Sequence, residues 1–109
     1  MTSSFTYNDA IRTIVDRIIE RFQPKQVILF GSHARGTAGR HSDIDLLVVF
    51  DQVDDKRRMA IELREAVSDL PVAKDFVVTT PEEIARRGHL VGTALRSALR
   101  EGRVLYDAA

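Results

Sequence analysis

The chain has 109 residues, which predicts one domain over 1–109, because this length provides too little core for two. Sixteen basic residues balance sixteen acidic ones, which argues against a basic surface that binds nucleic acid or anionic membranes. The chain contains no cysteine, so it has neither disulfides nor thiolate metal sites, and a cytoplasmic location is expected. No apolar run approaches the roughly 18 residues of a membrane span, and the first residues lack a signal-peptide pattern.

The first third of the chain predicts a helix followed by a strand. Between Asn8 and Phe22, apolar residues recur at helical spacing and charged residues occupy the other face. Pro24 stops this amphipathic helix. The apolar run 26–30, bounded by Pro24 and Gly31, is typical of a buried strand.

The middle of the chain predicts two further strands and a second amphipathic helix. Residues 32–35 could begin a short helix, and the segment 36–39 has the composition of a loop. A strand is expected over 43–50, and a helical face of apolar residues lies within 51–70. The segment 73–79 then predicts a third strand.

The last third predicts two helices and a short strand. Thr80 is a good helix cap, because Pro81 follows it at the first helical position and Glu83 completes a capping box. The segment 90–99, rich in alanine and leucine, predicts another helix, and 104–106 predicts a last strand. Helices and strands therefore alternate in an α/β (α+β) unit.

Two aspartates at the start of the second strand are the most informative feature. Asp43 and Asp45 point to the same face of a strand, with Cα atoms about 7 Å apart. Two carboxylates held so close repel each other unless a cation lies between them, and oxygen ligands suit Mg²⁺ or Mn²⁺. Asp43 could be only a turn residue, but Asp45 is flanked by apolar residues and favours a metal-binding function.

The glycine-serine pair before these aspartates predicts phosphate binding. Gly31 permits a tight exit from the strand, and the backbone N–H groups after it, with the Ser32 hydroxyl, can hold phosphate oxygens. Arg35 and Arg40 could neutralise phosphate or could be ordinary loop cations. His33 lies next to Ser32, and its position is the only argument for a contact with nucleotide.

Asp75 is a third candidate acid. It is followed by apolar residues, so it resembles Asp45 as an acid that enters a buried strand. If the third strand lies beside the second, Asp75 could join the metal site or act as a general base. The alternative is an acid at a strand edge that pairs with Lys74 or an arginine.

These motifs together resemble a known signature. Gly31-Ser32, ten residues and then Asp43-Ile44-Asp45 resembles the nucleotidyltransferase signature of the DNA polymerase β-like superfamily, and Gly-Ser-His-Ala-Arg-Gly resembles its minimal nucleotidyltransferase (MNT) branch. The resemblance implies a nucleotidyltransferase fold, a small mixed β-sheet flanked by helices. It also implies that Asp43, Asp45 and Asp75 hold two Mg²⁺ ions about 3.5 to 4 Å apart. Nucleotide phosphates would lie over Gly31 and Ser32.

The resemblance further implies a reaction and a partner. MNT proteins resemble antitoxins paired with a HEPN-domain toxin, and family members transfer AMP from ATP to a tyrosine of that toxin. The chain is then an Mg²⁺-dependent protein adenylyltransferase with ATP as substrate and no nucleic acid or membrane partner. Two alternatives remain open: an antitoxin that neutralises its partner by binding alone, and transfer to a small-molecule acceptor.

Overall fold

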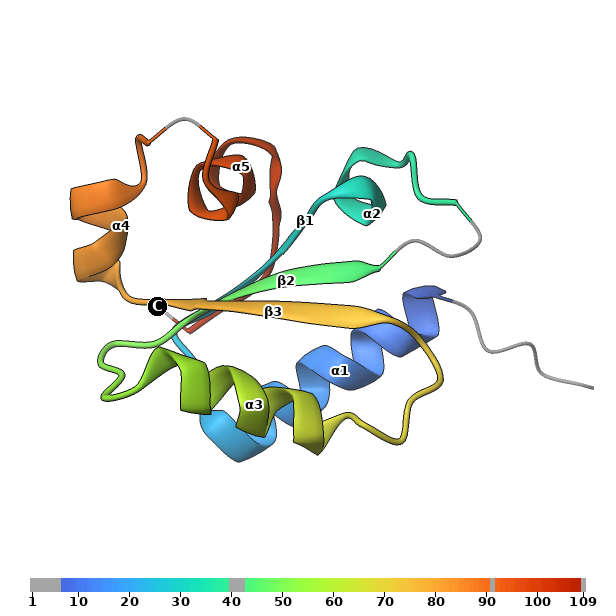
Figure 1. The fold of residues 1–109 in the computed structure, drawn as a ribbon. Helices are drawn as coiled ribbons and strands as arrows, with labels where there is room; N and C mark the ends of the chain where they lie inside the picture. Colours follow the sequence, from blue (N-terminus) through green and yellow to red (C-terminus); the bar gives the residue numbers. More distant parts are fainter. Residues whose placement is uncertain (1–6, 40–42, 91, 109) are drawn as a thin grey trace, which may run out of the picture.

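The computed structural model describes residues 7–39, 43–90 and 92–108 (Figure 1). The elements in chain order are α1 (Tyr7–Phe22), β1 (Gln26–Phe30), α2 (Ser32–Arg35), β2 (Ile44–Val49), α3 (Lys56–Ala66), β3 (Lys74–Thr79), α4 (Pro81–Arg87), α5 (Ala94–Glu101) and β4 (Arg103–Asp107). These elements confirm the predicted alternation of helices and strands. Over the described ranges, no helix combines the length and the apolar character needed to cross a membrane.

The four strands form one mixed sheet in the order β3-β2-β1-β4. Strand β1 lies in the middle and pairs antiparallel with both β2 and β4. Strand β3 pairs parallel with β2, which requires a crossover connection, and α3 supplies it. The small mixed sheet flanked by helices is therefore as expected.

One face of the sheet is closed by α1 and α3, which lie side by side below it in Figure 1. The buried stripe of α1 includes Ile14 and Ile18, which are fully inaccessible to solvent. Leu63 and Val67 fill the same layer from the end of α3. This layer is the main core, because periodic apolar residues of both helices pack on the inward side chains of β1, β2 and β3. We call it the closed face.

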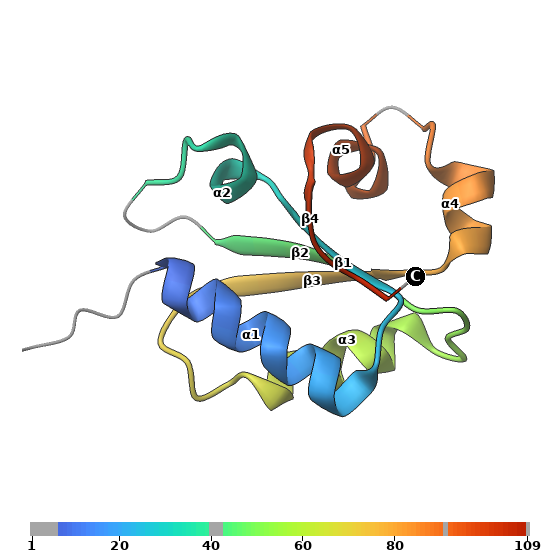
Figure 2. The same cartoon turned by 180° about the vertical axis from the view of Figure 1, so that it is seen from behind.

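The opposite face carries α2, α4 and α5, as the reverse view also shows (Figure 2). Its buried cluster is smaller and joins Leu95 and Ala98 of α5 to four strand residues, Ile28, Phe30, Leu47 and Val49. Helix α5 therefore covers only part of the sheet, and the ends of β2 and β3 nearest α2 carry polar side chains on this side. We call it the open face.

The last helix begins later than predicted. The sequence favoured a helix from Leu90, but α5 starts at Ala94, with Thr93 as its N-cap accepting a hydrogen bond from the Arg96 backbone N–H at 3.1 Å. Gly92, with a φ of 85°, turns the chain immediately before this cap. Leu90 therefore lies outside the helix and is 38% exposed.

Candidate active site

The strand register brings the predicted acids to one place on the open face. Asp45, the second residue of β2, lies opposite Phe30 of β1 on one side and opposite Asp75 of β3 on the other. Residues at one register position of neighbouring strands project to the same face. Phe30 belongs to the apolar cluster of the open face, so Asp45 and Asp75 are assigned to that face.

Gly31 lies directly against Asp45. Its φ of 77° and ψ of −157° lie in a backbone region that residues other than glycine rarely adopt. A Cβ atom at this position would lie 2.3 Å from Oδ2 of Asp45, which is too close for any substituent. The turn after β1 can therefore contact the Asp45 carboxylate on β2 only with glycine at position 31.

Asp45 is partly buried and is surrounded by like charge. Burial, followed by the negative charges of Asp75 and Asp43, raises the pKa of the Asp45 carboxyl above its usual value. The positive charges of His33 and Arg35 act in the opposite direction but do not outweigh these effects. The three carboxylates thus influence one another, as expected for acids that need a cation between them.

Asp75 differs from its predicted environment. Strand β3 is at the edge of the sheet, and although Phe76 and Val78 after it are buried as predicted, Asp75 itself is exposed. Arg64 of α3 reaches Asp75 from the closed face, with Nη2 at 3.1 Å from Oδ1. The same oxygen accepts the Phe76 backbone N–H at 3.1 Å. This contact matches the alternative prediction, in which Asp75 is an acid at a strand edge that pairs with an arginine.

The described residues do not form a preassembled metal site. No group of three or more His, Asp or Glu side chains within the described ranges is arranged to hold a metal ion. The chemistry of the donors nevertheless fits Mg²⁺, because Asp43, Asp45 and Asp75 offer only carboxylate oxygens. Burial raises the pKa of Asp45 most, and the repulsion from Asp75 and Asp43, which such a cation would relieve, adds to it. These residues therefore suit the ion, provided that Asp75 exchanges its contact with Arg64.

Helix α2 supplies the other predicted residues. Ser32 begins the helix and is half-buried, while His33 packs on the ring of Tyr7 with centroids 4.5 Å apart. Arg35 ends the helix and points to α5, where its Nη1 lies 3.3 Å from Oε2 of Glu101. Arg40, the other candidate cation, lies outside the described residues.

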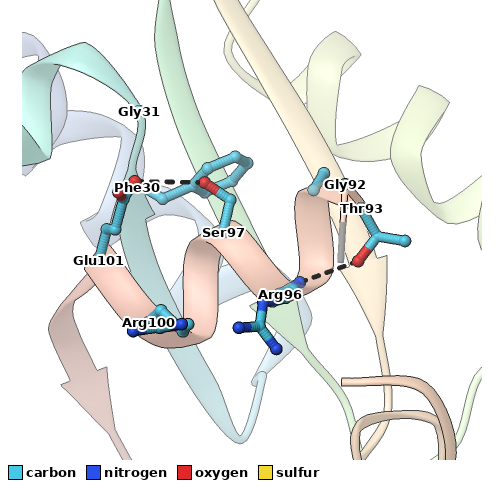
Figure 3. Close-up of a pocket in the computed structure, with 9 residues that line it drawn as sticks. Phe30, Gly31, Gly92, Thr93, Arg96, Ser97, Arg100 and Glu101 are labelled. Carbon is cyan, nitrogen blue, oxygen red and sulfur yellow. Dashed lines mark hydrogen bonds between the residues drawn. The ribbon is translucent and has the colours of Figure 1, made fainter. Parts of the chain in front are cut away.

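A cavity of about 600 Å³ lies between the end of β1 and helix α5 (Figure 3). Phe30 and Gly31 form one wall, and the opposite wall is lined by Gly92, Thr93, Ala94, Arg96, Ser97, Arg100 and Glu101. The α5 residues that line this cavity were not predicted from the sequence. Arg96 and Arg100 are spaced i, i+4, and that spacing was their only signal, which is common on solvated helix faces.

A family model described as "Nucleotidyltransferase domain" matches residues 11–105. Two proteins of Methanocaldococcus jannaschii, both named "Putative protein adenylyltransferase", are similar in sequence. One is 33% identical over 100 residues, covering 89% of this chain and 95% of the relative. The other is 38% identical over 53 residues, covering 43% of this chain and only 36% of the relative.

Solved structures share the fold. A structure from Sulfolobus solfataricus described as a "putative nucleotidyltransferase" has a TM-score of 0.60 at 23% identity, covering 91% of this chain and 78% of that one. A toxin-antitoxin structure with AMP-PNP has a TM-score of 0.59 at 23% identity, covering 88% and 72%. A mutant of the toxin-antitoxin MntA-HpeT has a TM-score of 0.57 at 19% identity, covering 88% and 72%.

Proposed function

This chain belongs to the nucleotidyltransferase domain family, and we propose that it transfers AMP from ATP to a tyrosine of a cognate HEPN-domain toxin, acting as the antitoxin. The observation that carries the proposal is the contact between the Gly31 turn and Asp45, with Asp75 beside Asp45 in the register. This contact lets a phosphate on the turn lie next to the carboxylates that a nucleotidyl transfer needs.

We assign Asp43, Asp45 and Asp75 as the metal ligands and catalytic acids. Magnesium bound there would supply positive charge at the attacking and leaving oxygens of the transfer. Gly31 and Ser32 hold the phosphate nearest the acids, and Arg35 adds a cation at the end of α2. Arg35 already contributes positive charge at Asp45, which supports its place near the reacting phosphate.

The reaction moves one AMP group between two oxygens. The acceptor hydroxyl oxygen forms a bond to the α-phosphorus, and the bond from that phosphorus to the α,β-bridging oxygen breaks. Pyrophosphate leaves with the electron pair of the broken bond, and AMP remains on the acceptor. The hydroxyl proton passes to a carboxylate, for which Asp75 is the candidate because it is exposed at the sheet edge.

Two kinds of relative support a protein as the acceptor. The M. jannaschii protein that matches over 95% of its own length is named a protein adenylyltransferase. Chains of the same fold were solved as toxin-antitoxin structures, one of them with the ATP analogue AMP-PNP. We therefore propose a protein acceptor and ATP as the nucleotide.

The proposal is tested by intact-mass spectrometry of the cognate HEPN-domain toxin, after incubation with the chain and MgATP. We expect the toxin to gain the mass of one AMP group and the modified peptide to contain a tyrosine. Asp43→Asn with Asp45→Asn should abolish the adduct. Asp16→Asn with Asp54→Asn, two exposed acids away from the site, should leave it unchanged. An adduct that persists in the Asp43 and Asp45 variant would refute the site.

One observation favours a second candidate function. Asp75 is paired with Arg64 and no metal-binding group of three is assembled within the described ranges, which suits an antitoxin that uses the fold only as a scaffold. Such a protein would protect cells from the toxin with both Asp43 and Asp45 replaced by asparagine. Loss of protection in that variant, with toxin binding retained in a pull-down, would exclude the scaffold function.

A further inference from the structure

The chain contains two tyrosines, and one of them lies at the same end of the sheet as the candidate site. Tyr7 is the first residue of α1, and both views show this end of the helix where β2 begins and α2 follows β1 (Figures 1 and 2). Tyr106 pairs instead with Val27, near the other end of β1, so about 13 Å of strand separates its position from Gly31. Tyr7 is therefore the tyrosine that can approach the acids.

The ring of Tyr7 is joined to the candidate site through a single residue, His33. The two rings are tilted by 47° with centroids 4.5 Å apart, which is the separation of an aromatic pair in contact. His33 follows Ser32 directly on α2, so its backbone belongs to the predicted phosphate-binding turn. Burial and the neighbouring acids raise the pKa of Asp45, and the charge of His33 opposes this shift, so the imidazole also lies near that carboxylate.

The packing of Tyr7 holds its ring in place and leaves the side chain partly exposed. One partner is the buried cluster of the closed face, and the other is the His33 ring. A group that is held beside a reacting centre reacts as an intramolecular acceptor, without the entropic cost of a second molecule. The proposed function already makes a tyrosine hydroxyl the acceptor of AMP, so the same chemistry fits Tyr7 without a further co-reactant.

We infer that the chain transfers AMP to its own Tyr7. The inference rests on the proposed function, which supplies ATP, the acids and a tyrosine as the chemical class of the acceptor. The phenolic oxygen of Tyr7 forms a bond to the α-phosphorus, and the bond from that phosphorus to the α,β-bridging oxygen breaks. Pyrophosphate leaves with the electron pair, and the hydroxyl proton passes to Asp75, as in transfer to the toxin.

Intact-mass spectrometry of the chain alone, after incubation with MgATP, tests this inference. We expect the chain to gain the mass of one AMP group on the peptide that carries Tyr7. Tyr7→Phe keeps the ring that contacts His33 and removes only the acceptor oxygen, so it should abolish the adduct. Tyr106→Phe, which changes the other, partly exposed tyrosine in the same way, is the matched control and should leave the adduct unchanged. Asp43→Asn with Asp45→Asn should abolish it.

A mixing experiment distinguishes transfer within one chain from transfer between chains. The Asp43 and Asp45 variant keeps Tyr7, so it should stay unmodified when it is incubated with the active Tyr7→Phe chain and MgATP. The rate constant of self-modification should also stay the same when the wild-type chain is diluted, because the step is intramolecular. Modification of the inactive chain, or an adduct that maps to Tyr106, would overturn the inference.

Modification of the toxin separates this inference from the proposed function. Tyr7→Phe should modify the toxin at the rate of the wild-type chain, because the acids and the turn are unchanged. A wild-type chain that modifies the toxin but gains no AMP at Tyr7 would refute the inference and leave the proposed function standing. An adduct at Tyr7 without any adduct on the toxin would support the inference and refute the toxin as the acceptor.

Discussion

The two faces of the sheet differ in how completely they are packed. Among the described residues, fourteen form the buried cluster of the closed face and six form that of the open face. The closed face is covered by two amphipathic helices, whereas the open face leaves room beside α5 for a cavity and for Asp45. The candidate site therefore occupies the face where apolar burial is smallest, because ionised groups there keep access to water and ligand.

The largest expected effect is a loss of stability that is greater for a core substitution on the closed face than for one on the open face. Leu63→Ala, on the closed face, should lower the free energy of unfolding by about 3 kcal/mol, because Leu63 is fully buried. Leu95→Ala, on the open face, should lower it by about 2 kcal/mol and also weaken ATP binding, because α5 lines the cavity. Urea unfolding and calorimetry measure both quantities. Equal losses of stability would contradict the difference between the faces.

The next effect tests the contact of Gly31 with Asp45. Gly31→Ala should destabilise the protein by about 2 kcal/mol, because it combines backbone strain with a clash against Oδ2 of Asp45. Gly36→Ala is the matched control: its φ of 75° is nearly the same as the 77° of Gly31, but no atom lies within 4 Å of the added Cβ. Gly36→Ala should show the strain alone, about 1 kcal/mol, in the same unfolding experiment. A larger loss for Gly36→Ala would refute the clash.

Glu83 joins the two faces at the far end of the sheet. Its carboxylate accepts hydrogen bonds of 2.6 Å from Lys56 on α3 and 2.6 Å from Thr79 on β3. Burial opposes ionisation of Glu83, but these two hydrogen bonds outweigh it and lower its pKa. Glu83→Gln should therefore lower the free energy of unfolding by about 1 kcal/mol at pH 7.

The pH dependence of the stability lost in Glu83→Gln follows from the direction in which the pKa of Glu83 is shifted. A lowered pKa stabilises the protein above the unfolded value of about 4.3, and the stabilisation disappears as the pH falls through the folded pKa. The difference between wild type and Glu83→Gln should therefore shrink in urea titrations as the pH falls below about 4. A difference that grows toward acid pH would contradict the lowered pKa.

The smallest expected effect is a gain in stability, whereas the preceding substitutions lower it. Because the pKa of Asp45 is raised, ionisation of Asp45 lowers stability as the pH rises above the unfolded value of about 3.9. Asp45→Asn should therefore raise stability at pH 7 only slightly, because solvent screens this partly exposed carboxylate, while it abolishes transfer. The gain should vanish below about pH 4, where the unfolded carboxyl is protonated too. A less stable variant at pH 7 would show that Asp45 supports the fold.

Local signals in the sequence predicted most of the elements. The helix expected from Asn8 to Phe22 starts one residue earlier, and the Thr80 cap forms as expected, with Oγ1 accepting the Glu83 backbone N–H. Periodicity and capping act within a few residues of chain, so sequence reasoning reaches them. The start of α5 was wrong, because apolar spacing through Leu90 hid the turn at Gly92.

The arrangement of the site depends on contacts between distant residues. The spacing of Asp43 and Asp45 predicted an acidic pair on one strand, but β2 begins at Ile44, so Asp43 immediately precedes the strand and only Asp45 lies on it. Only the sheet order reveals that β3 is an edge strand that leaves Asp75 exposed. The pairing of Arg64 with Asp75, eleven residues apart in the chain, also requires the packing of α3 beside β3. The arginines of α5 had no distinctive motif, and only the fold reveals that they line the cavity.

The ion pair between Arg64 and Asp75 joins a helix of the closed face to an acid of the open face. A cation that takes Oδ1 of Asp75 competes directly with the guanidinium of Arg64 for that oxygen. By thermodynamic reciprocity, whatever frees Arg64 favours cation binding, and cation binding in turn frees Arg64. Under the proposed metal assignment, the Arg64 side chain on α3 and the ion at the sheet edge would therefore exclude each other from the same oxygen of Asp75.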